Sequence, residues 1–162
     1  MGNLEACFVV GMIAFLHYPL LRPLPVIDKN LKRAARGGHK VAAYVPAVLL
    51  YMANGGTGVD NTARQYMRQA VGDEPVKVPW GGAKMLCNEE CYHIRERVTM
   101  LRIWLQMSRK AVVLPVHADV VPCKCGKCDS VVVLLWPQFG CKVFCSEDCR
   151  ICFEPNLFLC CI

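Results

Sequence analysis

The spacing of apolar positions predicts one long helix in the middle of the chain, over residues 44–71 (YVPAVLLYMANGGTGVDNTARQYMRQAV). Apolar side chains recur there every seven residues with a second row beside them, which is typical of a single helix face. The positions that define this face are Val45, Leu49, Met52, Val59, Ala63 and Tyr66. Gly55, Gly56 and Gly58 each cost about 1 kcal/mol relative to alanine in a helix interior. Because the pattern keeps its phase across them, we predict one bent or partly broken helix, with Pro46 in its first turn.

A short amphipathic helix is predicted just before it, within VIDKNLKRAARGGHK (residues 26–40). Asp28 is a suitable N-cap, and Gly37 with Gly38 ends the helix. The basic residues of this segment share one face, because they are spaced i, i+3, i+4 and i+7. They are Lys29, Lys32, Arg33 and Arg36, opposite Ile27, Leu31 and Ala35. Such a face is either an ordinary solvated surface or one that lies along a polyanion.

After a loop with two prolines, a third helix is predicted to start within residues 80–98, with Met85, Leu86, Ile94 and Val98 as its apolar positions. A bridging helix follows over residues 95–110, and we expect Leu101, Trp104, Leu105 and Met107 to face the core. The chain thus divides into an apolar N-terminal arm (1–21), a helical domain (22–98), a bridging helix and strand (99–122) and a cysteine-rich module (123–162). The predicted fold class is mainly α, followed by a small α+β module.

Composition supports a folded protein with a cationic middle. Hydrophobic residues make up 54% of the 162 and charged residues 20%, and the formal net charge is +6. Residues 22–98 hold 12 Lys/Arg against 7 Asp/Glu, so most of the positive charge lies there. The N-terminal arm has Glu5 instead of a basic start, lacks a clear cleavage site and is short for a membrane span. We therefore expect an intracellular protein.

The order of these elements and several short sequence motifs resemble those of a core histone, most closely the histone two-A type. PVIDKNLKRAARGGHKV is similar to that family's first helix and first loop, AVLLYM followed by NTAR to its central helix, and KVP followed by MLCNEEC to its second loop and last helix. The resemblance covers about 75 residues, and no single word is specific. The basic N-terminal tail is missing, and the acidic-patch positions of the central helix fall on Leu50, Gly55 and Gly58.

The resemblance implies a histone fold of short, long and short helices that pairs with a second histone-fold protein, such as a B-type histone. The six positions of the apolar face would then form the dimer interface. DNA phosphates would be held by the basic first helix and the two loops, where Lys40 and Lys77 match the family's loop arginines. The implied function is non-enzymatic packaging or organisation of double-stranded DNA in a nucleus, a virion or a viral factory.

The cysteine-rich end predicts a zinc site. Cys125-x-x-Cys128 forms a knuckle, residues 131–136 read as a strand, and Cys145 and Cys149 are one helical turn apart. This order is typical of a treble-clef site and resembles FCS-type zinc fingers. A closed site of four cysteines is structural. Cys123, Cys141 and Cys152 could each replace a ligand. Cys87 and Cys91 either form a second zinc site with two residues of this module or are core or interface residues; the roles of Cys160 and Cys161 stay open.

The sequence gives little support to an enzyme. GGTG at residues 55–58 lies within the helical pattern instead of following a strand, and no cysteine is paired with an evident base. Two alternatives to the histone-like function remain open. One is a zinc-finger transcription or scaffold factor whose helices bind protein partners, and the other is a disulfide-stapled secreted or virion-surface protein.

Overall fold

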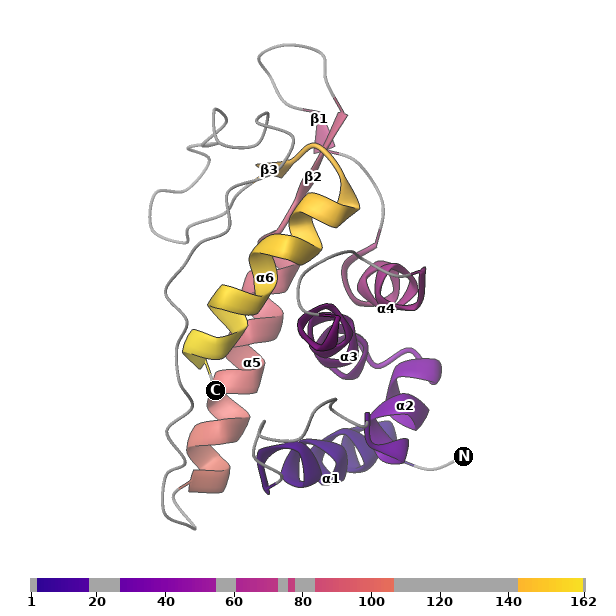
Figure 1. Cartoon of the computed structure of the whole chain (residues 1–162). Helices are drawn as coiled ribbons and strands as arrows, with labels where there is room; N and C mark the ends of the chain where they lie inside the picture. Colours follow the sequence, from indigo (N-terminus) through magenta and orange to yellow (C-terminus); the bar gives the residue numbers. More distant parts are fainter. Residues whose placement is uncertain are drawn as a thin grey trace.

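The computed structural model describes residues 3–17, 27–54, 61–72, 76–77, 84–106 and 143–161, which form six helices and three short strands. The mainly α class predicted from the sequence is confirmed. The helices are α1 (Leu4–His17), α2 (Lys29–Arg36), α3 (Lys40–Ala53), α4 (Asn61–Val71), α5 (Glu89–Gln106) and α6 (Glu147–Cys161). The strands are β1 (Val76–Lys77), β2 (Lys84–Cys87) and β3 (Val143–Phe144). Figure 1 shows α3 at the centre of this arrangement.

The core is assembled around α3. Its sequence is apolar on nearly every side, and all its side chains from Val41 to Leu49 are buried. A helix that is apolar all round needs cover all round. That cover comes from α2, α4, α5 and α6, each of which packs against α3.

The prediction of one long helix over residues 44–71 is wrong, because the chain forms α3 and α4 there. These two helices lie side by side and share the most extensive helix–helix contact among the described residues, which the halves of a continuous helix do not do. Gly55, Gly56 and Gly58 fall between them, outside the described residues. Three glycines in one helix would cost about 3 kcal/mol, whereas a break lets α4 cover one side of α3.

The helix α3 also begins earlier than predicted, so Pro46 lies inside it and not in its first turn. His39 is the N-cap: its Nδ1 accepts a hydrogen bond from the backbone N–H of Ala42 at 3.1 Å. A ring nitrogen that accepts carries no proton, so the proton is on Nε2, which donates to Glu5 Oε2 at 2.8 Å. A proline in a helix interior costs about 3 kcal/mol. The cap and the burial of α3 from Val41 to Leu49 together outweigh that cost.

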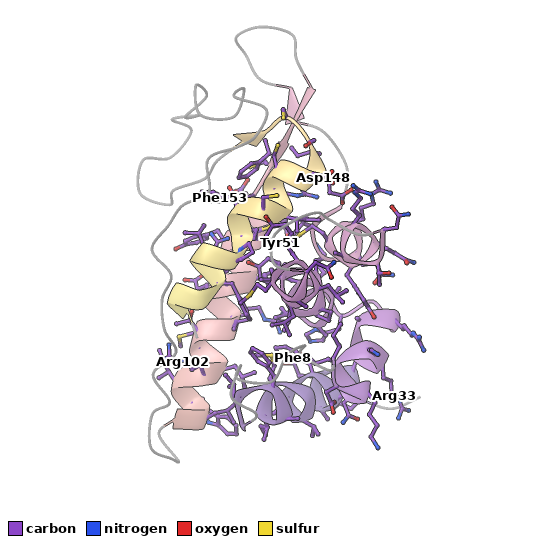
Figure 2. All side chains as sticks on the ribbon, in the orientation of Figure 1. Phe8, Arg33, Tyr51, Arg102, Asp148 and Phe153 are labelled. Atoms are coloured by element: carbon purple, nitrogen blue, oxygen red, sulfur yellow. The ribbon has the colours of Figure 1, made fainter. Side chains whose placement is uncertain are left out.

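The apolar N-terminal arm is helix α1, and it packs onto the core. Phe8 and Met12 are buried, and Phe8 stacks on His39 with ring centroids 4.6 Å apart. Figure 2 shows Phe8 between α1 and α3. At Gly11 a Cβ atom would lie 2.6 Å from Cγ of Leu31. The close approach of α1 to α2 therefore requires glycine at this position.

The predicted third helix and bridging helix are one helix, α5, which begins only at Glu89. The residues before it form β2, so the helical assignment of Met85 and Leu86 is wrong. Ile94 and Val98 are buried, as predicted. Trp104, predicted to face the core, is 64% exposed instead. The buried side chains of α5 thus lie in its first half, and its last turns are more exposed to solvent.

The C-terminal helix α6 belongs to the same core. The strands form a small antiparallel sheet in the order β1-β2-β3, with Leu86 opposite Phe144 and Cys87 opposite Val143. From β3 the chain enters α6, which lies along α5 and against α3 (Figure 1). Ile151 and Phe158 of α6 are fully buried in the hydrophobic core with residues of α3. The core therefore extends across the boundary that the sequence predicts at residue 123.

A buried carboxylate joins α6 to α3 and α5. Glu154 is completely buried, and its Oε2 accepts a hydrogen bond from the Tyr44 hydroxyl at 2.6 Å and another from Arg95 Nη1. Its Oε1 accepts from Asn88 Nδ2 at 3.3 Å. Burial, together with the adjacent Glu154, raises the pKa of Tyr44 well above its ordinary value. Burial opposes the charge of Arg95, but Glu154 and Tyr44 outweigh it and raise the pKa of Arg95.

Ion pairs join the first turn of α6 to α4. Arg64 makes a bidentate pair with Asp148, with Nε–Oδ1 and Nη2–Oδ2 distances of 2.7 and 2.9 Å. Arg68 Nε donates to Glu147 Oε2 at 2.9 Å. The hydrogen bonds from Arg64 lower the pKa of Asp148 below its ordinary value of 3.8, against a smaller effect of burial. In Figure 2, Asp148 lies at the start of α6 on the side of α4.

We predict that Glu154→Gln lowers the free energy of unfolding by about 3–5 kcal/mol, because Arg95 would keep a buried charge without a counter-charge. Urea denaturation measures the loss. Glu96→Gln is the matched control, since Glu96 is 61% exposed and its replacement should cost less than about 0.5 kcal/mol. The double variant Arg95→Met/Glu154→Gln should recover part of the loss, because it removes both charges. A single-variant loss below about 1 kcal/mol would contradict this role for Glu154.

We also predict that Arg64→Gln destabilises the protein by up to about 1 kcal/mol near neutral pH, a small value because Asp148 is half exposed. A carboxylate with a lowered folded pKa stabilises the fold above its unfolded pKa, and this contribution disappears as the pH falls through the folded pKa. The difference between wild type and variant should therefore shrink below about pH 4. Urea titrations across the acid range measure it, with Lys32→Gln as an unpaired exposed control. A difference that persists unchanged in acid would refute the assignment.

Candidate nucleic-acid interface and metal centre

The basic face of α2 is held outward by the packing of its opposite side. Asp28 caps the helix by accepting a hydrogen bond from the backbone N–H of Asn30 at 2.7 Å, and Gly37 is the C-cap. Leu31, Ala34 and Ala35 are buried. The predicted cap, the predicted end and the predicted apolar side are therefore all confirmed.

Four cations lie on the solvent side of these eight residues. Lys29, Lys32, Arg33 and Arg36 are all exposed, and within the described part of the chain no carboxylate forms an ion pair with any of them. Arg33 lies at the outer edge of the molecule (Figure 2). α2 is about 12 Å long, and one DNA strand carries a phosphate about every 3.4 Å along the axis. The face thus has the length of three or four phosphates.

The two loop lysines differ in how much the structure describes of them. Lys40, at the start of α3, pairs with Glu90 of α5 at 3.4 Å, and the two side chains are 60% and 53% exposed. An ion pair this exposed contributes little, so Lys40 can exchange Glu90 for a phosphate at small cost. Lys77 is in β1, and its side chain lies outside the described residues. Of these two lysines, only Lys40 has a described side chain, and its ammonium group lies near Glu90 of α5.

The positions predicted to face a second histone fold are largely occupied by the chain's own core. Val45, Leu49 and Ala63 are fully buried, while Met52 and Tyr66 are partly buried and pack against the same core. Val59 lies outside the described residues. In this fold, the buried members of the apolar face need no second chain to cover them.

The two cysteines predicted as the second pair of zinc ligands lie close together. Cys145 directly follows β3, and Cys149 lies in the first turn of α6, where Ser146 Oγ accepts a hydrogen bond from its backbone N–H at 3.3 Å. The two Sγ atoms are 3.5 Å apart. The turn from strand to helix thus brings the two sulfur atoms together, as their spacing predicts.

This separation suits a shared zinc ion. Two ligands in a tetrahedron with Zn–S bonds of about 2.3 Å have their sulfur atoms about 3.8 Å apart. A shift of a few tenths of an ångström would therefore accommodate the metal. The other predicted ligands, Cys125 and Cys128, lie outside the described residues, as do Cys123 and Cys141. Within the described residues, no group of three or more His, Cys, Asp or Glu side chains is placed to hold a metal ion.

Two of the surplus cysteines face the core. Cys91 is fully buried, and this burial, with the nearby Glu154, raises the pKa of its thiol well above the ordinary value. Such a thiol is a poor nucleophile, because the thiolate is the reactive form. Cys152 packs against the core beside Tyr51. Burial and the Cys152 thiol together raise the pKa of Tyr51. Figure 2 shows Tyr51 between α3 and α6.

Sequence reasoning missed the polar groups that position this centre. Glu147 and Asp148, between the two cysteines, are both anchored by arginines of α4, and Glu147 is only 11% exposed. Arg150 is buried and donates to the carbonyl oxygens of Gly72 at 3.0 Å and Cys87 at 3.4 Å. Apart from an ion pair between Arg150 and Glu147 at 3.8 Å, these contacts join residues more than 60 positions apart in sequence, which no local pattern predicts.

None of the described helices combines the length and apolar character needed to cross a membrane. Comparisons of the chain with protein-family models, with curated proteins and with solved structures find no match.

Proposed function

We propose that the chain is a non-enzymatic protein that binds double-stranded DNA through the cationic face of α2. The single observation that carries this proposal is the set of four exposed cations on one side of α2, which have no acidic partner among the described residues. Contacts of this kind go to phosphates and carry little sequence information. We expect it to organise or package DNA, in a nucleus or a viral factory.

Charge placement supports this function. A protein surface that is merely solvated usually intersperses both signs of charge, whereas α2 has no acidic residue in its first turn or elsewhere in its sequence KNLKRAAR. Lys40, at the start of the next helix, is a further exposed cation, and its only described partner is an exposed carboxylate. An exposed basic helix held by a rigid core is a suitable platform for phosphates.

We further propose a structural zinc ion held by Cys145 and Cys149 together with Cys125 and Cys128. The separation of the two described sulfur atoms supports it. In this role the metal would fix the entry into α6 and carry out no chemistry. The ion pairs of Glu147 and Asp148 with α4 would hold the same turn from the other side.

Pairing with a second histone fold is the less supported part of the resemblance. A histone pair depends on a long central helix whose apolar face is covered by the partner. Here α3 and α4 lie side by side, and the chain buries most of that face itself. We therefore propose that DNA binding does not require a histone partner.

One observation favours a scaffold that binds protein partners as a second candidate. Met100, Ile103 and Trp104 are large apolar side chains exposed at the end of α5. A scaffold of this kind would hold zinc and bind protein but be indifferent to DNA. The DNA titration below separates the two functions.

We predict that the wild-type protein binds duplex DNA with an affinity that falls steeply with salt, with a slope of log K against log salt of about −3 to −4. Each neutralised cation should reduce the slope by about 1, so Lys32→Ala/Arg33→Ala should lose about half of it. Fluorescence anisotropy at several salt concentrations measures both values.

Arg68→Gln is the matched control, because Arg68 is equally exposed but already pairs with Glu147. It should leave the slope unchanged. A parallel titration with a B-type histone present tests whether pairing is needed. Absence of binding with and without the histone would refute the DNA-binding proposal. Binding only in the presence of the histone would show that the chain must pair with a histone to bind DNA.

We also predict about one zinc ion per chain purified under reducing conditions, measured by mass spectrometry of the metal. Cys145→Ser and Cys149→Ser should each abolish zinc binding, as should Cys125→Ser. Cys152→Ser is the control that should retain the metal, because that thiol packs beside Tyr51. A wild-type protein without zinc, or loss of zinc only in the control, would contradict the assignment.

A further inference from the structure

The exposed side of α5 carries a repeating line of residues that neither the DNA-binding surface nor the metal centre uses. Its members recur every three or four positions, the spacing of a seam between two helices. They are His93, Glu96, Arg97, Met100, Ile103 and Trp104, all exposed. The first three are polar and the last three are large and apolar.

The apolar end of this line lies beyond the cover of the other helices. Met100, Ile103 and Trp104 are 63%, 48% and 64% exposed. In contrast, Val98, which lies two residues before Met100 on the opposite side of the helix, is fully buried. In Figure 1 the last turns of α5 extend past the end of α6. Together the three side chains present roughly 300–400 Å² of apolar surface, the size of the largest patch on a typical monomer, and such patches are often functional.

We propose that this face of α5 binds the same face of a second copy of the chain, with the two helices antiparallel. A two-fold axis near Arg102 would place Met100 of each copy against Trp104 of the other, and Ile103 beside the axis. A methionine sulfur beside an aromatic ring is a favourable contact, and here it is made twice. Glu96 and Arg97 then lie at the edge of the interface, where charged residues belong.

The area argues for a second copy of modest affinity. Two such patches and their polar edges bury roughly 800–1,200 Å² in total, which is at the low end for specific interfaces. The interface is self-complementary, because the same three residues supply both halves. We therefore expect a reversible dimer with a dissociation constant of tens of micromolar, on the order of 10⁻⁵ M.

Sedimentation velocity from about 1 to 200 µM tests this proposal. The wild type should shift from monomer to dimer over this range. Met100→Lys and Trp104→Glu should each raise the dissociation constant at least about tenfold. Val10→Glu is the matched control, because Val10 is an apolar residue of α1 that is 51% exposed and lies outside this face. Circular dichroism checks that each variant keeps its helices.

The double variant Met100→Lys/Trp104→Glu separates the antiparallel arrangement from a parallel one. In the antiparallel dimer each lysine faces a glutamate of the other copy, so the double variant should lose less affinity than the two single losses combined, whereas a parallel pair would bring like charges together and lose more. A wild type that stays monomeric throughout would overturn the proposal and mean that the chain's own residues or another protein cover this face. A double variant whose loss equals or exceeds the two single losses combined would overturn the antiparallel contact.

Discussion

The fold depends on one buried ion pair, which Glu154 of α6 forms with Arg95 of α5. Glu154 brings a carboxylate into the centre of the protein, where an unpaired charge would be prohibitively costly. Arg95 of α5 supplies the counter-charge, and Tyr44 of α3 and Asn88 supply the remaining hydrogen bonds. Because these partners come from different parts of the chain, α6 can dock in only one register. The apolar contacts of Ile151 and Phe158 add stability but would tolerate sliding, whereas the hydrogen bonds of Glu154 would not.

The docking of α6 also determines the position of the candidate metal centre. Cys149 lies five residues before Glu154 on the same helix, so fixing α6 also fixes the turn that carries both cysteines. The arginines of α4 then hold Glu147 and Asp148 from the other side. A metal here would reinforce a turn that the protein already builds, and it would link residues near position 125 to the core.

Local rules explain which parts could be predicted. The cap at Asp28, the end at Gly37 and the outward cations of α2 are all decided within ten residues, and all were correct. The closeness of the Cys145 and Cys149 sulfur atoms also follows from their local spacing, whereas their role as zinc ligands stays a prediction. Failures arose where distant packing decided the outcome. A seven-residue repeat cannot distinguish one helix from two helices that pack together, and Pro46 is tolerated because other helices enclose α3. Trp104 has the same helical spacing whether its neighbour is the chain's own core or another molecule.

Because α3 is packed by helices of its own chain, the histone-like sequence motifs have a different implication for function. In a histone, the central helix is exposed until a partner covers it, so folding and DNA binding are coupled to pairing. Here α3 is enclosed by four helices of its own chain, and α2 presents its cations on the outside of a complete core. Phosphate binding needs only that outer face, because its energy comes from release of counterions and not from burial of apolar surface. The proposed DNA-binding role of the basic helix is therefore compatible with the packing of α3 inside its own chain.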